Sequence, residues 1–319
     1  MSGPILVTGA TGFIGQHLVR RLLAQDARVR VLCRRPEALP GELRARVEVV
    51  AGDLRDGEAV RRSVAGVHTV LHLGACARAW SADPHEFRAV NLDAVAELLA
   101  AAEREGVQRL VHVSTVLTMR LEEKRGRSLT PYEATKLEGE RLVEACPAAV
   151  IVHPTRVYGP GPLNDANGVT RVIAAYLTGR FRVRLADGDV QANYVHVHDV
   201  ADGIVLAARR GRPGAHYVLG GENASLAGLL AAVAELSGVR RRVYPIHPRL
   251  AVAAAGAVEM WGRLGGQVPI TRDWVRLFLE DQRVDTTLTD AELGHTPRGL
   301  AAGLSETLEW LRGDARRAA

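Results

Sequence analysis

Short apolar runs alternate with helix-like segments through the first half of the chain. Strands are predicted at residues 5–8, 29–33, 47–50, 69–73, 110–113 and 150–153, where β-branched and other apolar residues follow one another. Between these runs, apolar residues recur at helical spacing, as Ile14, Leu18 and Leu22 do, and this predicts amphipathic helices. Such alternation is typical of right-handed βαβ units in a parallel sheet that is covered on both faces. The pattern therefore predicts an α/β fold with a doubly wound, Rossmann-like parallel sheet.

The regular alternation of predicted strands and helices ends after residue 153. Several prolines and glycines interrupt the pattern there, further strands are predicted at residues 194–197 and 217–219, and residues 226–310 are mostly helical in pattern. We expect residues 1–155 and 194–219 to form a dinucleotide-binding domain. Residues 156–193 and 220–319 are expected to form a smaller, mostly helical substrate-binding lobe.

Composition excludes several classes of protein. With 319 residues, 47% of them hydrophobic, the chain can bury a large core without disulfides. Cys33, Cys76 and Cys146 have no metal-ligand spacing and are expected to be reduced thiols of a cytoplasmic protein. We find no signal-peptide pattern and no apolar stretch of about 20 residues, so no membrane partner is expected. The net charge of +5 comes from dispersed arginines, which argues against nucleic-acid binding.

Three glycines lie between the first predicted strand and the first predicted helix. Gly9, Gly12 and Gly15 have the spacing G-x-x-G-x-x-G rather than the common G-x-G-x-x-G. A dinucleotide pyrophosphate needs a tight turn, a backbone that it can approach closely, and a helix N-terminus directed at its charge. The alternative, ordinary turn glycines in a chain with 32 glycines, does not explain their place between strand and helix. The motif therefore predicts nucleotide binding.

The end of the second predicted strand indicates which dinucleotide is bound. NAD enzymes usually carry an Asp or Glu there, which holds the ribose 2′-hydroxyl, whereas this chain has Arg34 and Arg35. A guanidinium can pair with a 2′-phosphate through two hydrogen bonds, while a carboxylate would repel it. The alternative is a solvated arginine in an arginine-rich chain. We expect NADP(H) to be preferred, with NAD(H) possible.

Tyr132 and Lys136 are candidates for acid/base chemistry. They are four residues apart in a predicted helix whose cap lies at Thr130 and Pro131, so both side chains share one face. A free phenol has a pKa of about 10 and is a poor base at neutral pH. An ammonium about 4 Å away stabilises the phenolate by up to about 4 kcal/mol, which would bring that pKa close to neutral. We therefore expect Tyr132 to be the acid/base and Lys136 to lower its pKa.

Two hydroxyl side chains follow the predicted strand at residues 110–113. Ser114 and Thr115 lie at the carboxyl edge of a parallel strand, where ligands bind in open α/β sheets. A hydroxyl there can hold the oxygen of a substrate and stabilise the charge that develops on it. The pattern itself leaves open which of the two does so.

These motifs, in this order, resemble those of the extended short-chain dehydrogenase/reductase family, also called the NAD-dependent epimerase/dehydratase family. The resemblance runs from residue 4 to about residue 311 and includes residues 153–161, 194–201 and 293–298. It implies that Asp53 reaches the adenine amine and that His72 to Ala75 lie beside the ribose and nicotinamide. It also implies that Asn91 ties the active-site helix to the sheet.

The resemblance also assigns the catalytic residues, because the family's hydroxyl aligns best with Thr115 and its Tyr-x-x-x-Lys with Tyr132 and Lys136. Family members often pair through the helices that begin near Asn91 and Tyr132, which implies a homodimer. Together, the motifs predict these cofactor-binding residues: Gly9, Thr11, Gly12, Phe13, Ile14, Gly15, Arg34, Asp53, Leu54, Leu73, Gly74, Ala75, Asn91, Val113, Tyr132, Lys136, Pro154 and Thr155.

Departures from the family pattern narrow the range of reactions that we expect of this chain. Sugar dehydratases of the family carry an Asp-Glu pair after the catalytic hydroxyl, where this chain has Val116 and Leu117, so dehydration is disfavoured. His153 replaces the usual arginine, and only 16 residues separate the catalytic hydroxyl from the catalytic tyrosine, which implies a short substrate loop. Arg34 and the helical C-terminal half look most like the dihydroflavonol reductase and 3β-hydroxysteroid dehydrogenase branch.

We expect an NADP(H)-dependent oxidoreductase that interconverts a carbonyl and a secondary alcohol of a small-molecule substrate by hydride transfer. Two alternatives stay open: a nucleotide-sugar epimerase with tightly held NAD, and, less favoured, a non-catalytic NADP-binding sensor. Arg78, Trp80 and Arg156 are candidates for the substrate pocket. His196 and His198 alternate along a predicted strand and would face opposite sides, so no metal site is assigned.

Overall fold

A computed structural model of the chain describes residues 3–78, 81, 83, 85–119, 129–186, 190–263 and 271–318. Its centre is a seven-stranded sheet in the order β10-β6-β5-β4-β1-β2-β3, in which every neighbouring pair is parallel. The predicted doubly wound, Rossmann-like α/β fold is confirmed, and these strands match the predicted ranges to within one residue at each end. They are β1 (Ile5–Thr8), β2 (Val29–Cys33), β3 (Glu48–Ala51), β4 (Thr69–His72), β5 (Arg109–Val113), β6 (Ala149–Pro154) and β10 (His216–Leu219).

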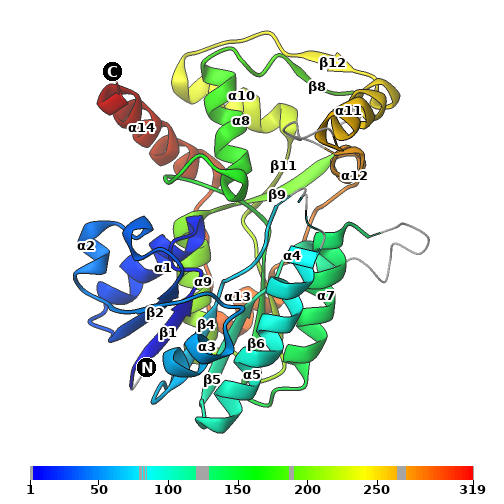
Figure 1. Cartoon of the computed structure of the whole chain (residues 1–319). Coiled ribbons are helices and arrows are strands. Elements are labelled where there is room, and N and C mark those ends of the chain that lie inside the picture. The colour runs from blue at the N-terminus through cyan, green and yellow to red at the C-terminus, as the bar shows by residue number, and fades with distance from the viewer. Residues whose placement is uncertain are drawn as a thin grey trace.

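Alternate strand residues enter two hydrophobic cores, one on each face of the central sheet. In β1, Ile5 and Val7 pack in the core that α1 (Phe13–Leu23) and α9 (Val197–Arg210) cover. Leu6 faces the other core, to which α3 (Gly57–Val64), α5 (Ala94–Arg104) and α7 (Pro131–Glu144) contribute. Figure 1 shows helices on both sides of the sheet. Burial on both faces explains why these strands are continuous apolar runs.

A second group of elements lies beyond the carboxyl edge of the central sheet, at the top of Figure 1. It contains a three-stranded sheet in the order β11-β9-β7 and a parallel pair, β12 and β8. Helices α8, α10 and α14 enclose a third core with β9. The bounds are β7 (Arg156–Tyr158), β8 (Val183–Leu185), β9 (Gln191–His196), β11 (Glu222–Ser225), β12 (Tyr244–Ile246), α8 (Gly168–Leu177), α10 (Leu226–Ser237), α11 (Pro248–Arg263), α12 (Arg272–Leu277) and α14 (Leu300–Ala318).

The predicted division into a dinucleotide-binding domain and a substrate-binding lobe stays a prediction. One C-terminal helix, α13 (Thr287–Leu293), contacts α9 and β10 of the central layers. The remaining elements are short turns of helix that connect the longer ones. They are α2 (Gly41–Arg44), α4 (His85–Arg88), α6 (Val116–Met119), two 3-10 helices (Pro36–Ala38 and Asp165–Asn167) and a π-helix (Ala89–Asp93).

All three cysteines are free; Cys33 and Cys76 are buried and Cys146 is partly buried. Within the described ranges, no helix combines the length and the apolarity that crossing a membrane requires.

Candidate active site

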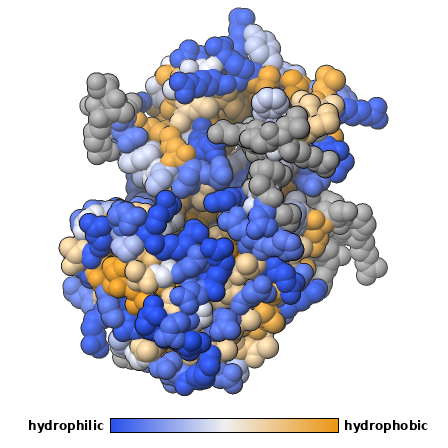
Figure 2. All heavy atoms as spheres, in the orientation of Figure 1, coloured by the Kyte–Doolittle hydropathy of each residue, from blue (hydrophilic) through white to orange (hydrophobic). Residues whose placement is uncertain are grey.

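The predicted site residues gather at the carboxyl edge of the central sheet, where the strand order reverses between β1 and β4. The helices that follow these two strands pack on opposite faces, which leaves a crevice of the kind that binds dinucleotides. In the space-filling view, the surface is hollowed between the central sheet and the second group of elements, and hydrophilic residues are prominent on the sheet side (Figure 2).

The turn after β1 requires glycine at two positions. Gly9 has a φ of +71°, in the left-handed region that favours glycine. A Cβ at Gly15 would lie 2.1 Å from the carbonyl oxygen of Gly9, and a Cβ at Gly9 would lie 2.8 Å from the backbone of Leu73. These glycines therefore bring the turn, the start of α1 and the loop after β4 into contact.

The N-terminus of α1 is open to an anion. The helix begins at Phe13, and its first turn has no acidic residue. Its N-cap residue is Gly12, and in the described part of the chain no side chain forms a capping hydrogen bond there. Phe13 is buried, while Thr11 and Ile14 are partly exposed. The unpaired first-turn N–H groups of a helix and its dipole favour a phosphate. The residues present therefore fit the pyrophosphate of a dinucleotide.

A cluster of charges lies beside the end of β2. Asp53 pairs with Arg55 at 2.8 Å and more distantly with Arg34 at 3.9 Å. The Arg55 hydrogen bond is the largest cause that holds the pKa of Asp53 below its ordinary value. The Arg34 side chain is 62% exposed, so it is accessible to a phosphate from solution.

The loop after β4 is tied to β1. Gly74 donates its N–H to Thr8 Oγ1 at 3.1 Å, and Leu73 donates to the carbonyl oxygen of Thr8 at 3.2 Å. A Cβ at Gly74 would meet the Leu54 side chain at 2.2 Å. The predicted cofactor residues Leu54, Leu73 and Gly74 therefore lie in contact, with Ala75 next along the loop.

Asn91 joins this loop to the helix that carries Tyr132. Its side chain is buried, and its Oδ1 accepts the N–H of Cys76 at 2.8 Å. Its Nδ2 donates to the carbonyl oxygen of Cys76 at 3.2 Å and to Thr135 Oγ1 at 3.1 Å. Thr135 belongs to α7, so Asn91 positions the loop and α7 relative to one another.

Helix α7 begins with a capping box. Thr130 Oγ1 accepts the N–H of Glu133 at 3.1 Å, and the Glu133 carboxylate accepts the N–H of Thr130 at 3.0 Å. Pro131 occupies the first turn, where its missing N–H costs nothing. The predicted cap is confirmed, and it fixes Tyr132 and Lys136 in the first turns of the helix.

The two hydroxyls after β5 have different partners. Thr115 lies beside the phenol of Tyr132, and its side chain lowers the pKa of that phenol. Ser114 is buried and donates to Glu140 Oε2 at 2.5 Å. The geometry therefore brings Thr115 to Tyr132 and directs Ser114 away from it, which the sequence pattern alone left open.

Lys136 is buried and directed at the end of β5. Its Nζ donates to the carbonyl oxygen of Val113 at 2.9 Å and to His112 Nε2 at 3.2 Å. Burial lowers the pKa of Lys136 to about 8, and the nearby charge of Glu140 opposes that fall. The ammonium is therefore still mainly protonated at neutral pH.

The phenol of Tyr132 is less acidic than the sequence suggests. Burial raises the pKa of Tyr132 to about 12, and the neighbouring Thr115 side chain opposes that rise. The expectation that Lys136 brings this pKa close to neutral is wrong for this structure, because the loss of hydration outweighs the favourable contacts and the ammonium is bound to Val113 and His112. Tyr132 is therefore protonated at neutral pH, as a proton donor must be.

Two buried histidines lie behind Lys136. The resemblance placed His72 in the segment beside the ribose and nicotinamide, whereas His112 was not among the predicted site residues. His112 stacks on His72 with ring centroids 5.2 Å apart. Burial lowers the pKa of His72 to about 3 and that of His112 well below its ordinary value, and Lys136 adds to both effects. A neutral His112 can accept the hydrogen bond of Lys136. The sequence does place His72 and His112 in two predicted strands, at residues 69–73 and 110–113. The structure shows that they occupy paired positions in the β4–β5 register.

The expectation that His196 and His198 face opposite sides is wrong. β9 ends at His196 and α9 begins at Val197, so the backbone turns between the two and their rings lie 5.0 Å apart. Glu306 lies 3.0 Å from His198 Nδ1 and 3.9 Å from His196 Nε2. Arg298 also pairs with Glu306, so a cation is already present in this cluster.

The end of β6 reaches the second group of elements. Pro154 is buried, and Thr155 donates its hydroxyl to Asn193 Oδ1 at 2.8 Å. Thr155 also donates its N–H to the carbonyl oxygen of Leu219 at 3.2 Å. These contacts place both predicted cofactor residues at the junction of β6, β9 and β10.

Two of the three candidates for the substrate pocket lie in the described part of the chain, and their surroundings differ. Arg78 pairs with Glu86 at 3.3 Å. Arg156 donates to Gln282 at 3.2 Å and lies over the ring of Phe278, 4.8 Å from its centroid. The third candidate, at position 80, lies outside the described residues.

A Rossmann-like sheet with a hydroxyl, a tyrosine and a lysine at its carboxyl edge defines a short-chain dehydrogenase/reductase. The NAD dependent epimerase/dehydratase family matches residues 5–220, and the chain belongs to this family. It is thus an NAD(P)-dependent oxidoreductase of the extended short-chain dehydrogenase/reductase type, as the sequence motifs predicted.

Similar proteins span between two thirds and nearly all of the chain. Sterol demethylase protein B of Methylococcus capsulatus is 29% identical over 96% of this chain and 98% of its own length. A putative dihydroflavonol 4-reductase of Synechocystis is 28% identical over 98% and 95%. A 3-beta-hydroxysteroid dehydrogenase of Mycolicibacterium neoaurum is 28% identical over 66% and 62%. Relatives thus include the branch that the sequence resembled.

Solved structures share the fold over the whole length. The crystal structure of gox2253 has a TM-score of 0.81 at 26% identity and covers 99% of each chain. The UDP-glucose 4-epimerase of Thermus thermophilus, solved in complex with NAD, has a TM-score of 0.74 at 28% identity and covers 97% of this chain and 99% of its own. Both a reductase branch and an epimerase are therefore among the similar proteins.

Proposed function

We propose that this chain interconverts a carbonyl and a secondary alcohol, with NADP(H) as the preferred cofactor and Tyr132 as the acid/base. The observation that carries the proposal is that the Thr115 side chain lies beside a protonated Tyr132 at the carboxyl edge of the sheet. Relatives named as a reductase and a dehydrogenase support this type of reaction.

Tyr132 and Thr115 act on the oxygen of the substrate. In the reducing direction, Tyr132 donates its proton to that oxygen, and the Thr115 hydroxyl holds it in place. A bound nicotinamide supplies the hydride in this direction and accepts it in the other. Burial keeps the phenol protonated at neutral pH. Lys136, one turn further along α7, provides a positive charge near the phenolate that forms.

The cofactor preference rests on Arg34. Asp53 is held mainly by Arg55, and its contact with Arg34 is long at 3.9 Å. The exposed Arg34 guanidinium is therefore available for a bidentate contact with a 2′-phosphate. Gly9, Gly15 and the N-terminus of α1 would hold the pyrophosphate of the same dinucleotide.

A nucleotide-sugar epimerase that keeps NAD bound is the second candidate. The likeness to the UDP-glucose 4-epimerase of Thermus thermophilus favours it, and the acid/base residues would serve either reaction. A non-catalytic NADP-binding sensor is the third and least favoured candidate, because it needs no acid/base pair.

One set of measurements separates the three candidates. The purified protein is titrated with NADPH and NADH and then assayed against ketones, aldehydes and nucleotide sugars. We expect tighter binding of NADPH and NADPH-dependent reduction of a carbonyl. Stoichiometric bound NAD⁺ with conversion of a nucleotide sugar and no net redox change would contradict the reductase and support the epimerase. Binding of NADPH without hydride transfer to any carbonyl would support the sensor.

We also propose a homodimer that pairs through α5 and α7. Leu142 on α7 is 38% exposed, which supports a contact on the outer side of this helix. Light scattering coupled to gel filtration should give twice the chain mass of 34.4 kDa, and a mass equal to that of one chain would contradict the dimer. The cytoplasmic location also stays a prediction.

A further inference from the structure

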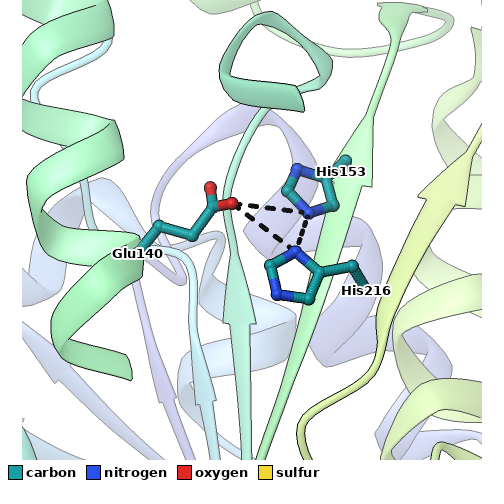
Figure 3. A group of neighbouring side chains, drawn as sticks. All are labelled: Glu140, His153 and His216. Atoms are coloured by element: carbon teal, nitrogen blue, oxygen red, sulfur yellow. Dashed lines mark hydrogen bonds and ion pairs between the residues drawn. The ribbon is translucent and has the colours of Figure 1, made fainter. Parts of the chain in front are cut away.

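Three side chains from three elements meet beside the edge strand of the central sheet (Figure 3). Glu140 lies on α7, His153 near the end of β6, and His216 at the start of β10. His216 pairs with Ile151 in the β10–β6 register, so it lies on the same face of the sheet as His153, two residues further along β6. Ile151 belongs to the core that α7 covers, and this explains how Glu140 reaches both histidines.

The inner atoms of the three side chains form a nearly regular triangle. Glu140 Oε1 lies 3.8 Å from His153 Nε2 and 3.6 Å from His216 Nδ1, and the two nitrogens are 3.1 Å apart. The point equidistant from these three atoms lies about 2.0 Å from each of them, which matches the bond lengths from Zn²⁺ to histidine nitrogen and carboxylate oxygen. Glu140 and His153 are buried, while the His216 side chain is 29% exposed.

The outer atom of each side chain has a partner of its own. His153 Nδ1 lies 3.1 Å from the carbonyl oxygen of Thr115, and His216 Nε2 lies 3.4 Å from Glu144 Oε1. Glu140 Oε2 accepts the hydroxyl of Ser114. A carbonyl and a carboxylate oxygen only accept hydrogen bonds, so each imidazole holds its proton on the outer nitrogen. Carboxylates and carbonyls orient metal-binding histidines in this way.

Three electron-pair donors consequently face a common centre. With their protons on the outer nitrogens, both imidazoles present a lone pair inward, toward an oxygen of Glu140. Lys136 is bound to Val113 and His112 instead. Such an arrangement attracts a cation to its centre.

We propose that Glu140, His153 and His216 bind one divalent transition-metal ion of the Zn²⁺ class. Two imidazole nitrogens and one carboxylate oxygen form a ligand set that this ion accepts, and a water molecule entering beside the partly exposed His216 completes four-coordination. The ion links α7, β6 and β10 and stabilises their packing behind the end of β5. The reductase reaction does not depend on it, so the two proposals can fail separately.

Zinc binding tests the site without any substrate. The full-length protein is stripped with a chelator and titrated with Zn²⁺ alone by calorimetry, and with Co²⁺ alone by visible absorption. We expect one equivalent of Zn²⁺ per chain, a rise in the melting temperature, and the visible bands of four-coordinate Co²⁺. Octahedral Co²⁺ or the absence of a saturable site would overturn the proposal, leaving a hydrogen-bonded cluster with a shared proton.

Variants locate the bound ion. His216→Gln changes a partly exposed side chain and should lose the Zn²⁺ equivalent while remaining folded by circular dichroism. Glu144→Gln removes only an outer partner and should weaken Zn²⁺ binding by about 10–100-fold. The matched control is His247→Gln, at an exposed histidine outside the triangle, which should bind Zn²⁺ as the unchanged chain does. Equal binding by His216→Gln and His247→Gln would place the ion elsewhere and overturn the site.

Discussion

The Thr115 side chain lies beside the phenol of Tyr132 at the carboxyl edge of the central sheet. Its neighbour Ser114 bonds instead to Glu140, on the side of the sheet that α7 covers. Adjacent residues of extended chain point in opposite directions, so only one of the two hydroxyls can face the reacting group. Thr115 and Ser114 therefore have different roles, and mutation of each should affect a different property.

Removal of each hydroxyl should affect a different property. Thr115→Val is expected to lower kcat by about 10²–10³-fold, because it removes a donor to the developing charge. Ser114→Ala leaves the buried Glu140 carboxylate without its hydroxyl partner and is expected to lower the free energy of unfolding by about 1–3 kcal/mol. Steady-state kinetics and urea unfolding of both variants check this pair. The opposite pattern would mean that Ser114 is the active-site hydroxyl.

The turn after β1 should not tolerate a side chain at Gly15. The added Cβ would lie 2.1 Å from the carbonyl oxygen of Gly9, so Gly15→Ala should displace the turn and abolish NADPH binding, measured by the fluorescence of the dinucleotide. Gly41→Ala is the control, because a Cβ there meets no atom within 4 Å. Unchanged affinity in Gly15→Ala would exclude this turn as the pyrophosphate site.

Arg34→Glu should raise the KM for NADPH but not the KM for NADH. Loss of a charged hydrogen-bonding partner of the 2′-phosphate costs about 1.5–3 kcal/mol, so the KM for NADPH is expected to rise by about 10–100-fold. NADH has no 2′-phosphate, and its KM should stay the same or fall. Arg249→Glu, at an exposed position on α11, is the charge-matched control. An equal loss with both cofactors would rule out a role of Arg34 in their discrimination.

Burial of Lys136 should make stability rise with pH. Its pKa falls from 10.5 in the unfolded chain to about 8 in the folded chain. Between these values the unfolded chain binds more protons, so the free energy of unfolding increases with pH, by at most about 1.4 kcal/mol per pH unit. Below pH 8 the cost of the buried charge is fully present. The pKa of Tyr132 is raised from 10.0 to about 12. Its contribution to stability is therefore fully present below pH 10 and is lost as the pH rises from 10 toward 12.

A comparison with Lys136→Met isolates this effect. Urea unfolding at pH 7, 8, 9 and 10 gives the stability of the unchanged chain minus that of the variant. This difference is expected to rise between pH 8 and pH 10 and to be flat below that window. A difference that is constant across the range would show that Lys136 is not buried as a charged group.

The fold was predictable from the sequence because its strands are buried on both faces. A continuous apolar run such as residues 5–8 is a strong local signal, and β1 has these bounds. The glycine turn and the Tyr132–Lys136 spacing are also local, since a helix places residues four apart on one face. Local patterns therefore located the crevice and its candidate acid/base pair.

What could not be predicted depends on contacts between distant parts of the chain. His153 and His216 are 63 positions apart, and nothing near either residue indicates that β6 and β10 are neighbours. His196 and His198 were misplaced because the chain changes from strand to helix between them. The pKa of Tyr132 was misjudged for a similar reason, because the sequence gives the nearby charge but not the depth of burial.

The Tyr132→Phe variant tests the central claim most directly. The measurement is NADPH oxidation with the best carbonyl substrate of the panel, together with NADPH affinity, in this variant and in Tyr244→Phe, whose tyrosine is 56% exposed. Loss of the acid/base is expected to lower kcat by about 10²–10⁴-fold, with NADPH affinity unchanged and Tyr244→Phe fully active. Turnover of Tyr132→Phe at the rate of the unchanged enzyme would contradict the account.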